Sequence, residues 1–120
     1  MVPHLHEGEY VFCTVKEWAA INPQEVVGTF REEEGWTLVM PRIVADRLQL
    51  PYAFIASWIT LTIHSSLEAV GLTAAFSKAL RDRQISCNVM AGYFHDHIFV
   101  PVQDAAVAIE VLQGLTLLRT

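Results

Sequence analysis

Residues 30–50 read FREEEGWTLVMPRIVADRLQL, and residues 91–112 read AGYFHDHIFVPVQDAAVAIEVL. Each stretch ends an apolar strand at a proline, Pro41 or Pro101, and then continues with helical spacing. A proline suits that position because it cannot donate to a sheet but is tolerated in the first turn of a helix. This weak internal repeat predicts two similar α+β units in one chain.

The first unit is predicted to contain three strands, a loop in place of a helix, and one helix. In chain order these are strand 9–15, loop 16–24, strands 26–32 and 36–40, and helix 43–50, which Pro51 ends. Gly35 supplies the positive φ that the acidic turn Glu32–Gly35 needs.

The second unit repeats this order and adds the missing helix. Its predicted elements are strand 57–64, helix 67–83, strands 84–92 and 98–102 around a turn at His95-Asp96, helix 104–113 closed by Gly114, and a possible edge strand 115–118. We therefore predict one compact domain, residues 1–120, made of a truncated unit (9–56) and a complete unit (57–120).

Composition excludes several classes of function. The net charge is −5 and no basic cluster is present, which argues against a nucleic-acid partner. The longest apolar stretch, residues 53–63, is too short to cross a membrane. The first ten residues lack the pattern of a signal peptide, so we expect a cytoplasmic protein. Cys13 and Cys87 lie in apolar runs and are expected to be buried free thiols.

Four segments resemble the ACT domain, a small regulatory module that binds amino acids. They are GEYVFCTV (8–15), GTFREEEGWTLVMP (28–41), WITLTIHSSLEAVGLTAA (58–75) and ISCNVMAGYFHDHIFVP (85–101). The chain looks closest to a group of small bacterial ACT-like proteins, and it is similar to paired-ACT amino-acid sensors and to the tandem ACT units of aspartokinases. The resemblance implies an α+β, ferredoxin-like fold with two pseudo-symmetric units, antiparallel sheets and helices on one face.

The turn between residues 64 and 71 is the predicted ligand site. Backbone N–H groups at a helix N-terminus can bind a ligand carboxylate. Gly71 allows the backbone to approach the ligand closely, and Glu68 could neutralise an ammonium group of the ligand. The alternative is a capping box in which Ser65 and Glu68 satisfy the helix itself. Spacing alone favours the cap, and the resemblance makes ligand binding an equal alternative. The ligand-binding set is Ser65, Ser66, Leu67, Glu68, Val70, Gly71 and Asn88.

The histidines suggest a metal site as a weaker hypothesis. His95 and His97 flank Asp96, and His4, His6 and His64 lie elsewhere in the chain. Imidazoles and a carboxylate can bind Zn²⁺ or Fe²⁺. Adjacent residues of a strand point to opposite faces, however, so a hairpin turn held by Asp96 is the better interpretation.

We therefore expect a non-catalytic regulatory protein that binds an amino acid or a similar small ligand and acts in trans on another protein, with no cofactor. One alternative is a ligand-free homo-oligomerisation module, most simply a dimer, and a weaker one is a metal-dependent enzyme that uses His95 and His97.

Overall fold

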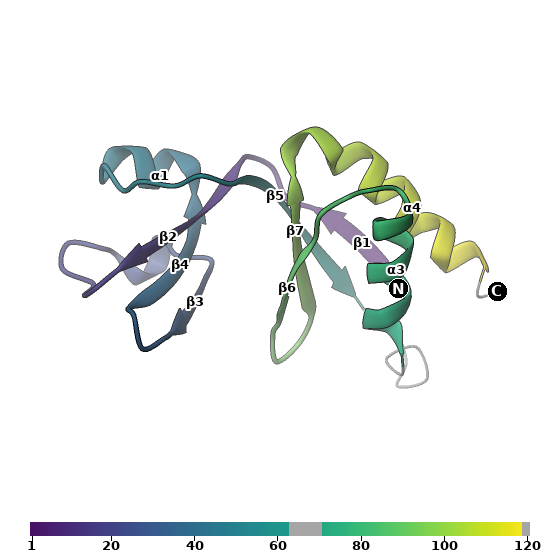
Figure 1. Cartoon of the computed structure of the whole chain (residues 1–120), viewed down its shortest axis with the longest axis horizontal. Helices are drawn as coiled ribbons and strands as arrows, with labels where there is room; N and C mark the ends of the chain where they lie inside the picture. Colours follow the sequence, from purple (N-terminus) through teal and green to yellow (C-terminus); the bar gives the residue numbers. More distant parts are fainter. Residues whose placement is uncertain (63–70, 119–120) are drawn as a thin grey trace. The chain divides into compact units, whose positions relative to one another are not determined.

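The computed structural model describes residues 1–62 and 71–118, and the chain divides into two compact units (Figure 1). Residues Gly8–Ala56 form one of them, which we call the inserted unit. Residues Met1–Glu7 and Ser57–Thr120 form the other, which we call the split unit because the inserted unit interrupts it in sequence. The sequence did not predict that the first seven residues group with the C-terminal part.

The inserted unit is a small antiparallel sheet with one α-helix. Its elements are β2 (Tyr10–Val15), the 3₁₀ turn η1 (Pro23–Glu25), β3 (Gly28–Arg31), β4 (Trp36–Pro41) and α1 (Arg42–Arg47). The strand order is β3-β4-β2, and Ile55 and Ala56 pair with the other edge of β2. Only η1 lies between β2 and β3, so the predicted absence of a leading helix is confirmed. The buried core residues are Val11, Cys13, Leu38, Met40, Val44 and Ala45.

Helix α1 ends earlier than predicted. Its last residue is Arg47, and Gln49 follows with a φ of 58°. The N–H of Leu50 donates to the carbonyl of Ala45, and the N–H of Gln49 donates to that of Asp46. This pair of bonds is a Schellman motif, so local hydrogen bonding ends the helix before Pro51 is reached.

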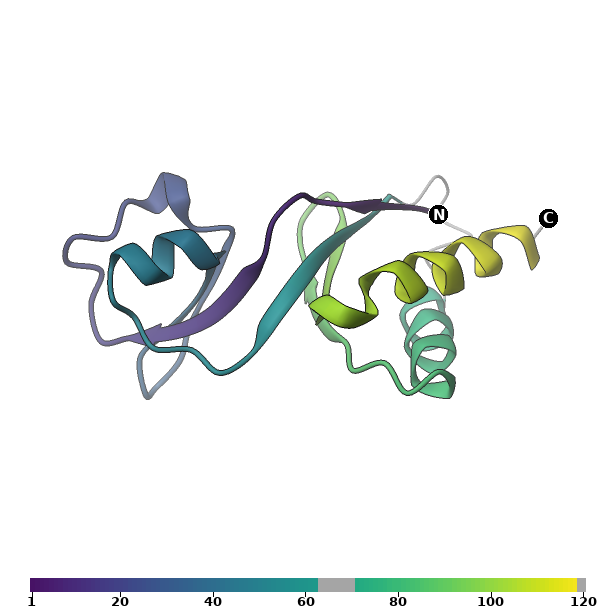
Figure 2. The ribbon, with the colours of Figure 1, turned by 90° about the horizontal axis from the view of Figure 1, so that it is seen from above.

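The split unit is a four-stranded antiparallel sheet with two helices on one face (Figures 1 and 2). The strands are β1 (Val2–Leu5), β5 (Ile55–Thr62), β6 (Asn88–Ala91) and β7 (Asp96–Pro101), in the order β6-β7-β5-β1. The helices are α3 (Leu72–Asp82) and α4 (Ala105–Leu118), with the 3₁₀ turn η2 (Val102–Asp104) before α4.

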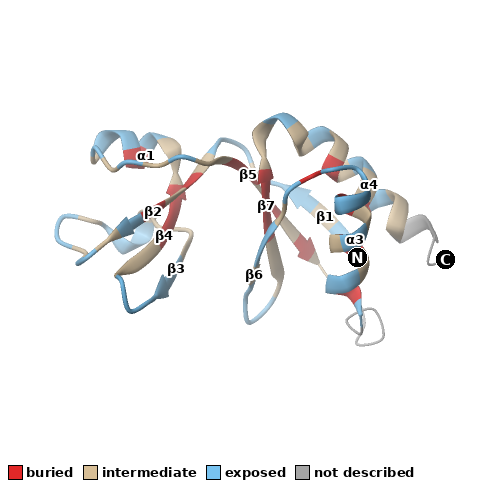
Figure 3. Ribbon diagram, viewed as in Figure 1, coloured by how far each residue is buried: buried red, intermediate tan, exposed pale blue. Residues whose placement is uncertain are grey.

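Strand β5 shows why one face of this sheet is covered. Ile59 and Leu61 are fully buried, whereas Trp58 and Thr60 alternate with them and are half-buried, as the sequence pattern predicts. Buried residues are concentrated on the central strands (Figure 3). The core of the split unit consists of Met1, Ile59, Leu61, Leu72, Phe76, Leu80, Ile85, Ile98, Val100, Ala108 and Leu112.

Two predictions for the C-terminus are wrong. Gly114 does not end the last helix, and Leu115–Leu118 is not an edge strand, because α4 continues to Leu118. Leu115 packs against the core, and that burial outweighs the cost of about 1 kcal/mol for a glycine within a helix. The fourth strand is supplied by β1, in which Val2 pairs with Thr62 and Leu5 pairs with Ile59.

The hairpin β6–β7 also differs in detail from the prediction. Asp96 and His97 belong to β7, and the turn is formed by the residues from Gly92 to His95, with the N–H of Gly92 donating to the carbonyl of His95. The predicted turn at His95-Asp96 is therefore displaced by about two residues. Helix α3 begins at Leu72, and the predicted helical residues 67–70 lie outside the described residues.

The internal repeat is visible in the backbone of both units. Pro41 has φ −55° and ψ 138°, and Pro101 has φ −54° and ψ 140°. Each proline ends an antiparallel strand and precedes a helical segment. The predicted α+β, ferredoxin-like fold with two pseudo-symmetric units is confirmed.

Candidate functional site

The predicted ligand turn is described only at its last residue. Ser65, Ser66, Leu67, Glu68 and Val70 lie outside the described residues, as does His64. Gly71 and Asn88 are the members of the predicted set that the structure places.

Gly71 is the N-cap residue of α3 and adopts a left-handed conformation, with φ 73° and ψ 4°. Its carbonyl accepts a hydrogen bond of 3.0 Å from the N–H of Ala75. A Cβ built at Gly71 would meet no atom within 4 Å among the residues that the structure describes. The backbone N–H groups at the start of a helix have no partner within it, and they are suited to binding an anionic group.

Asn88 lies elsewhere on the split unit. It is the exposed first residue of β6, opposite Phe99 of β7. Helix α3 has 11 residues and is about 16 Å long, and β6 follows its C-terminal end. Gly71 is thus at the N-terminal end of α3, whereas β6 follows the C-terminal end of this helix in the chain.

A group of aromatic and polar side chains occupies the sheet face opposite the helices. It comes from the N-terminal segment, β5 and β7, and consists of His4, His6, Trp58, Thr60, His97 and Phe99. The N–H of His6 donates to the carbonyl of Trp58 at 3.0 Å, which extends the β1–β5 pairing by one step. The rings of His6 and Trp58 are stacked, with centroids 3.5 Å apart and planes 11° apart.

Hydrogen bonds link four of these side chains: Trp58 and Thr60 each bond to His97, and His6 bonds to Thr60. The indole Nε1–H of Trp58 donates to Nδ1 of His97 at 3.1 Å. The hydroxyl oxygen of Thr60 lies 3.0 Å from the same Nδ1 and 2.7 Å from Nε2 of His6. We call His6, Trp58, Thr60 and His97 the imidazole network.

Both imidazoles of the network have a lowered pKa. Partial burial is the main cause for His6, and the neighbouring His4 and His97 lower its pKa further. Partial burial also lowers the pKa of His97, an effect that His95 strengthens and Asp96 opposes. Burial penalises the charged form, so both rings favour the neutral state at neutral pH.

The metal hypothesis gains no support from the described residues. No group of three histidine, cysteine, aspartate or glutamate side chains among them could hold a metal ion. The rings of His95 and His97 are 6.2 Å apart and lie edge to face. Nδ1 of His97 is hydrogen-bonded to Trp58 and Thr60, so this ring nitrogen is already occupied and not available to a metal ion.

The cysteines are suited to packing rather than to nucleophilic chemistry. Cys13 is buried, Cys87 is half-buried, and both are free thiols. Burial raises the pKa of Cys13, and it raises the pKa of Cys87 to about 11. Because the thiolate is the nucleophile, both side chains are poorly reactive at neutral pH.

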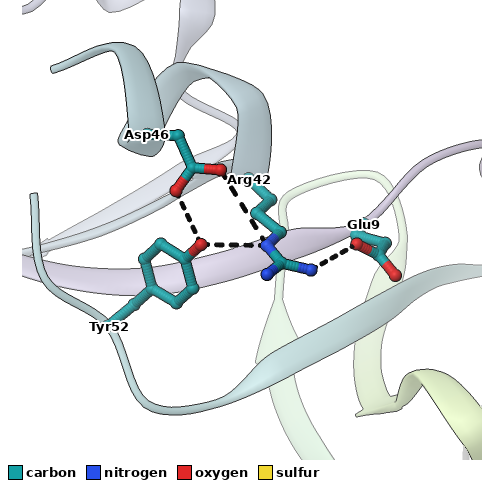
Figure 4. Close-up of polar contacts among 4 residues, drawn as sticks. All are labelled: Glu9, Arg42, Asp46 and Tyr52. Atoms are coloured by element: carbon teal, nitrogen blue, oxygen red, sulfur yellow. Dashed lines mark hydrogen bonds and ion pairs between the residues drawn. The ribbon is translucent and has the colours of Figure 1, made fainter. Parts of the chain in front are cut away.

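The inserted unit contains a second polar network, centred on Arg42 (Figure 4). Arg42 donates from Nη1 to Glu9 and from Nε to the hydroxyl of Tyr52, both at 2.9 Å. The Tyr52 hydroxyl donates to Asp46 at 2.6 Å. Hydrogen bonds to Tyr52 and Glu9 raise the pKa of Arg42 further above its usual range. The network joins Glu9, just before β2, to α1 and to the segment that precedes β5, which is a structural role.

Among the described residues, no helix is both long and apolar enough to span a membrane.

Two family models match the chain in succession. Residues 1–57 match a model described as an ACT domain, and residues 54–114 match a second ACT domain model. No match was found among curated proteins.

Solved structures extend this likeness. A Vibrio cholerae protein of unknown function, described as a possible transport protein, is 46% identical with a TM-score of 0.85, over 94% of this chain and 88% of that one. An Agobacterium tumefaciens protein is 16% identical with a TM-score of 0.71, over 93% and 86% of the two chains. Aspartokinase α and β subunits are 11% identical with a TM-score of 0.65, over 95% and 96%. The last two share only the fold.

Sequence reasoning missed the imidazole network. It considered the histidines for a metal site, preferred a hairpin turn at His95-Asp96, and did not predict β1. The available signal was the alternation of Trp58 and Thr60 on the polar side of β5. Bringing His6 to Thr60 also requires a strand pairing across 54 residues of sequence, which no local pattern reveals.

Proposed function

The chain belongs to the ACT domain family, whose members are regulatory ligand-binding modules, and we propose that it binds an amino acid without catalysing a reaction and regulates another protein in trans. The observation that carries this proposal is the left-handed Gly71 at the start of α3, where a Cβ would meet no described atom within 4 Å. The inserted unit has only η1 in the corresponding place. The proposed site is therefore the turn of the split unit, with Ser65, Ser66, Leu67, Glu68, Val70 and Gly71 around the ligand and Asn88 as a more distant contributor.

A thermal-shift screen of the common amino acids at millimolar concentration tests the proposal. A ligand that binds only the native state stabilises it by about 2.7 kcal/mol at one hundred times its Kd. We expect at least one amino acid to raise the melting temperature. If none does, the proposal fails.

Gly8 provides a matched control for Gly71. Both have a positive φ, 91° and 73°, and a Cβ at either would meet no described atom within 4 Å. The substitutions Gly71→Ala and Gly8→Ala should each cost about 1–3 kcal/mol of stability through backbone strain. Only Gly71→Ala should also abolish the stabilisation by the ligand, and equal responses of the two variants would place the ligand elsewhere.

Glu68→Ala separates ligand binding from helix capping. Loss of a capping interaction should cost about 1 kcal/mol and leave the increase in melting temperature with ligand unchanged. Loss of a ligand contact should reduce that increase. Asn88→Ala should have the smaller effect on the ligand response because β6 begins beyond the other end of α3.

A role in homo-oligomerisation is a second candidate, favoured by the exposed strand β6. This strand is at the edge of the described sheet, contains neither a charge nor a proline, and exposes 39% of Val89. Edge strands that stay unpaired usually carry such protective residues. Light scattering should show a dimer that Val89→Lys dissociates, and an unchanged monomer would exclude this role.

A further inference from the structure

We propose that the imidazole network of the split unit is a proton-operated switch, in which protonation of His97 at Nδ1 releases the indole of Trp58. This proposal does not depend on ligand binding at the turn before α3.

The first step concerns the tautomer of His97. An indole Nε1–H can only donate, so Nδ1 of His97 must accept the 3.1 Å hydrogen bond from Trp58. A nitrogen that accepts has no proton of its own. His97 is therefore neutral in this arrangement and carries its proton on Nε2.

The second step fixes the direction of the other bonds. Because Nδ1 of His97 has no proton, the hydroxyl of Thr60 can only donate to it, at 3.0 Å, and shares the single lone pair of that nitrogen with the indole N–H. The Thr60 proton is then used, so Nε2–H of His6 donates to the Thr60 oxygen at 2.7 Å. The hydrogen bonds therefore run in one direction, from His6 through Thr60 to His97.

Protonation affects the two histidines differently. A second proton on His6 would go to Nδ1 and leave its Nε2–H donor in place. A second proton on His97 goes to Nδ1 and converts the acceptor of Trp58 into a donor. Thr60 can rotate its hydroxyl and accept instead, but an indole N–H cannot accept. The bond between Trp58 and His97 is the one that must break.

The surroundings lower the pH at which the switch operates. Among the described residues of the split unit, the titratable groups that act on the network are His4 and His6 from the N-terminal segment and His95 and Asp96 next to His97 on the hairpin. Partial burial and the other imidazoles disfavour a charge on His97, and Asp96 opposes them only in part. The pKa of His97 is consequently below its ordinary value of 6.5. The hydrogen bond between Trp58 and His97 is intact at neutral pH and breaks as the pH falls through the pKa of His97.

NMR spectroscopy of the ¹⁵N-labelled full chain, titrated from pH 8 downward until His97 is protonated, tests this switch. The chain contains 3 tryptophans, and the indole signal of Trp58 is identified by its absence in Trp58→Phe. We expect the ¹⁵N shift of an unprotonated Nδ1 for His97 at pH 8. The indole proton of Trp58 should lose its hydrogen-bonded shift in one step, with the midpoint of His97.

Two variants isolate the role of His97. In His97→Asn the amide oxygen replaces Nδ1 as an acceptor that does not titrate, so the Trp58 signal should stay constant. In His6→Gln an N–H donor to Thr60 is kept, so the Trp58 signal should still titrate.

Three results would overturn the proposal: a protonated Nδ1 on His97 at pH 8, different midpoints for Trp58 and His97, or an unchanged Trp58 titration in His97→Asn. If His97→Asn does not fold, the tautomer and the paired midpoints of the native chain still decide the question.

Discussion

The two units place different side chains at the same point of equivalent strands. Thr37 stands four residues before Pro41 in β4, and His97 stands four residues before Pro101 in β7. Thr37 lies opposite Thr14 of β2 and donates its hydroxyl to Glu32, whereas His97 bonds to Trp58 and Thr60 of β5. The same backbone therefore holds a hydroxyl that does not titrate in one unit and an imidazole in the other, so the proposed acid switch depends on side chains rather than on the fold.

The hairpin tips differ in the same way. The tip of the inserted unit is the acidic turn Glu32–Gly35. In the split unit the tip carries Tyr93 and Phe94, which are 95% and 83% exposed, with their rings in edge-to-face contact. The hairpin of the inserted unit thus has a charged tip, and the equivalent hairpin of the split unit has an aromatic, apolar tip.

The largest expected effect tests whether the two cores are separate. Phe76 of α3 is fully buried in the core of the split unit, and Leu38 of β4 is fully buried in that of the inserted unit. Phe76→Ala should cost about 3–5 kcal/mol and Leu38→Ala about 2–5 kcal/mol. Hydrogen exchange should show each loss of protection mainly in the unit that carries the substitution. Equal losses throughout the chain would mean that the units unfold as one.

A second prediction compares the two turn glycines. Gly35 has a φ of 152°, and a Cβ there would lie 2.8 Å from the carbonyl oxygen of Val15. Gly35→Ala should cost about 1–3 kcal/mol from backbone strain, with the clash in addition. At Gly92 the nearest atom would be the carbonyl oxygen of His95 at 3.0 Å. Gly92→Ala should therefore cost less in urea denaturation, and a reversed order would contradict this comparison of the two turns.

Local sequence signals predicted the elements that depend on local chemistry. Pro41 and Pro101 mark the ends of strands, Gly35 marks a turn, and the spacing of Leu72, Phe76 and Leu80 marks the buried face of α3. These features follow from dihedral limits and from periodicity, which a single sequence contains.

Features that depend on distant pairing could not be predicted. Leu115–Leu118 has a composition that suits a strand, but β1 already occupies the fourth position of the sheet and α4 packs against the core. The network around His97 depends on the same pairing of β1 with β5. Of the candidate ligand site, the sequence predicts the turn, and the described structure places Gly71 and Asn88.

A third, smaller effect tests the difference between Thr37 and His97. A histidine whose pKa is lowered on folding binds fewer protons in the native state than in the unfolded state, so its contribution to stability is lost as the pH falls below 6.5. His97→Thr should weaken the fall in stability of the split unit between pH 7.5 and pH 5.5. Hydrogen exchange at the two pH values, corrected for intrinsic rates, measures this change.

His95→Thr is the control for that variant, since it removes a neighbouring imidazole outside the network. The acid sensitivity should remain in His95→Thr, with a slightly higher midpoint because His95 helps to lower the pKa of His97. An acid response of the inserted unit equal to that of the split unit would contradict the comparison.

The smallest expected effect concerns the surface networks of the two units. Tyr52→Phe removes the hydroxyl that accepts from Arg42 and donates to Asp46. Lys78→Ala removes a single ion pair, 2.9 Å long, with Asp82 in α3. Exposed ion pairs contribute little and are screened by salt, so we expect both melting temperatures to fall by about 2 °C or less at low ionic strength.

Tyr52→Phe should show the larger fall in melting temperature because its hydroxyl connects two charged groups. In 0.5 M salt, part of the fall in Tyr52→Phe should remain, whereas the fall in Lys78→Ala should vanish. If both losses vanish together in salt, the Arg42 network is held by charge alone and the Tyr52 hydroxyl adds nothing to the inserted unit.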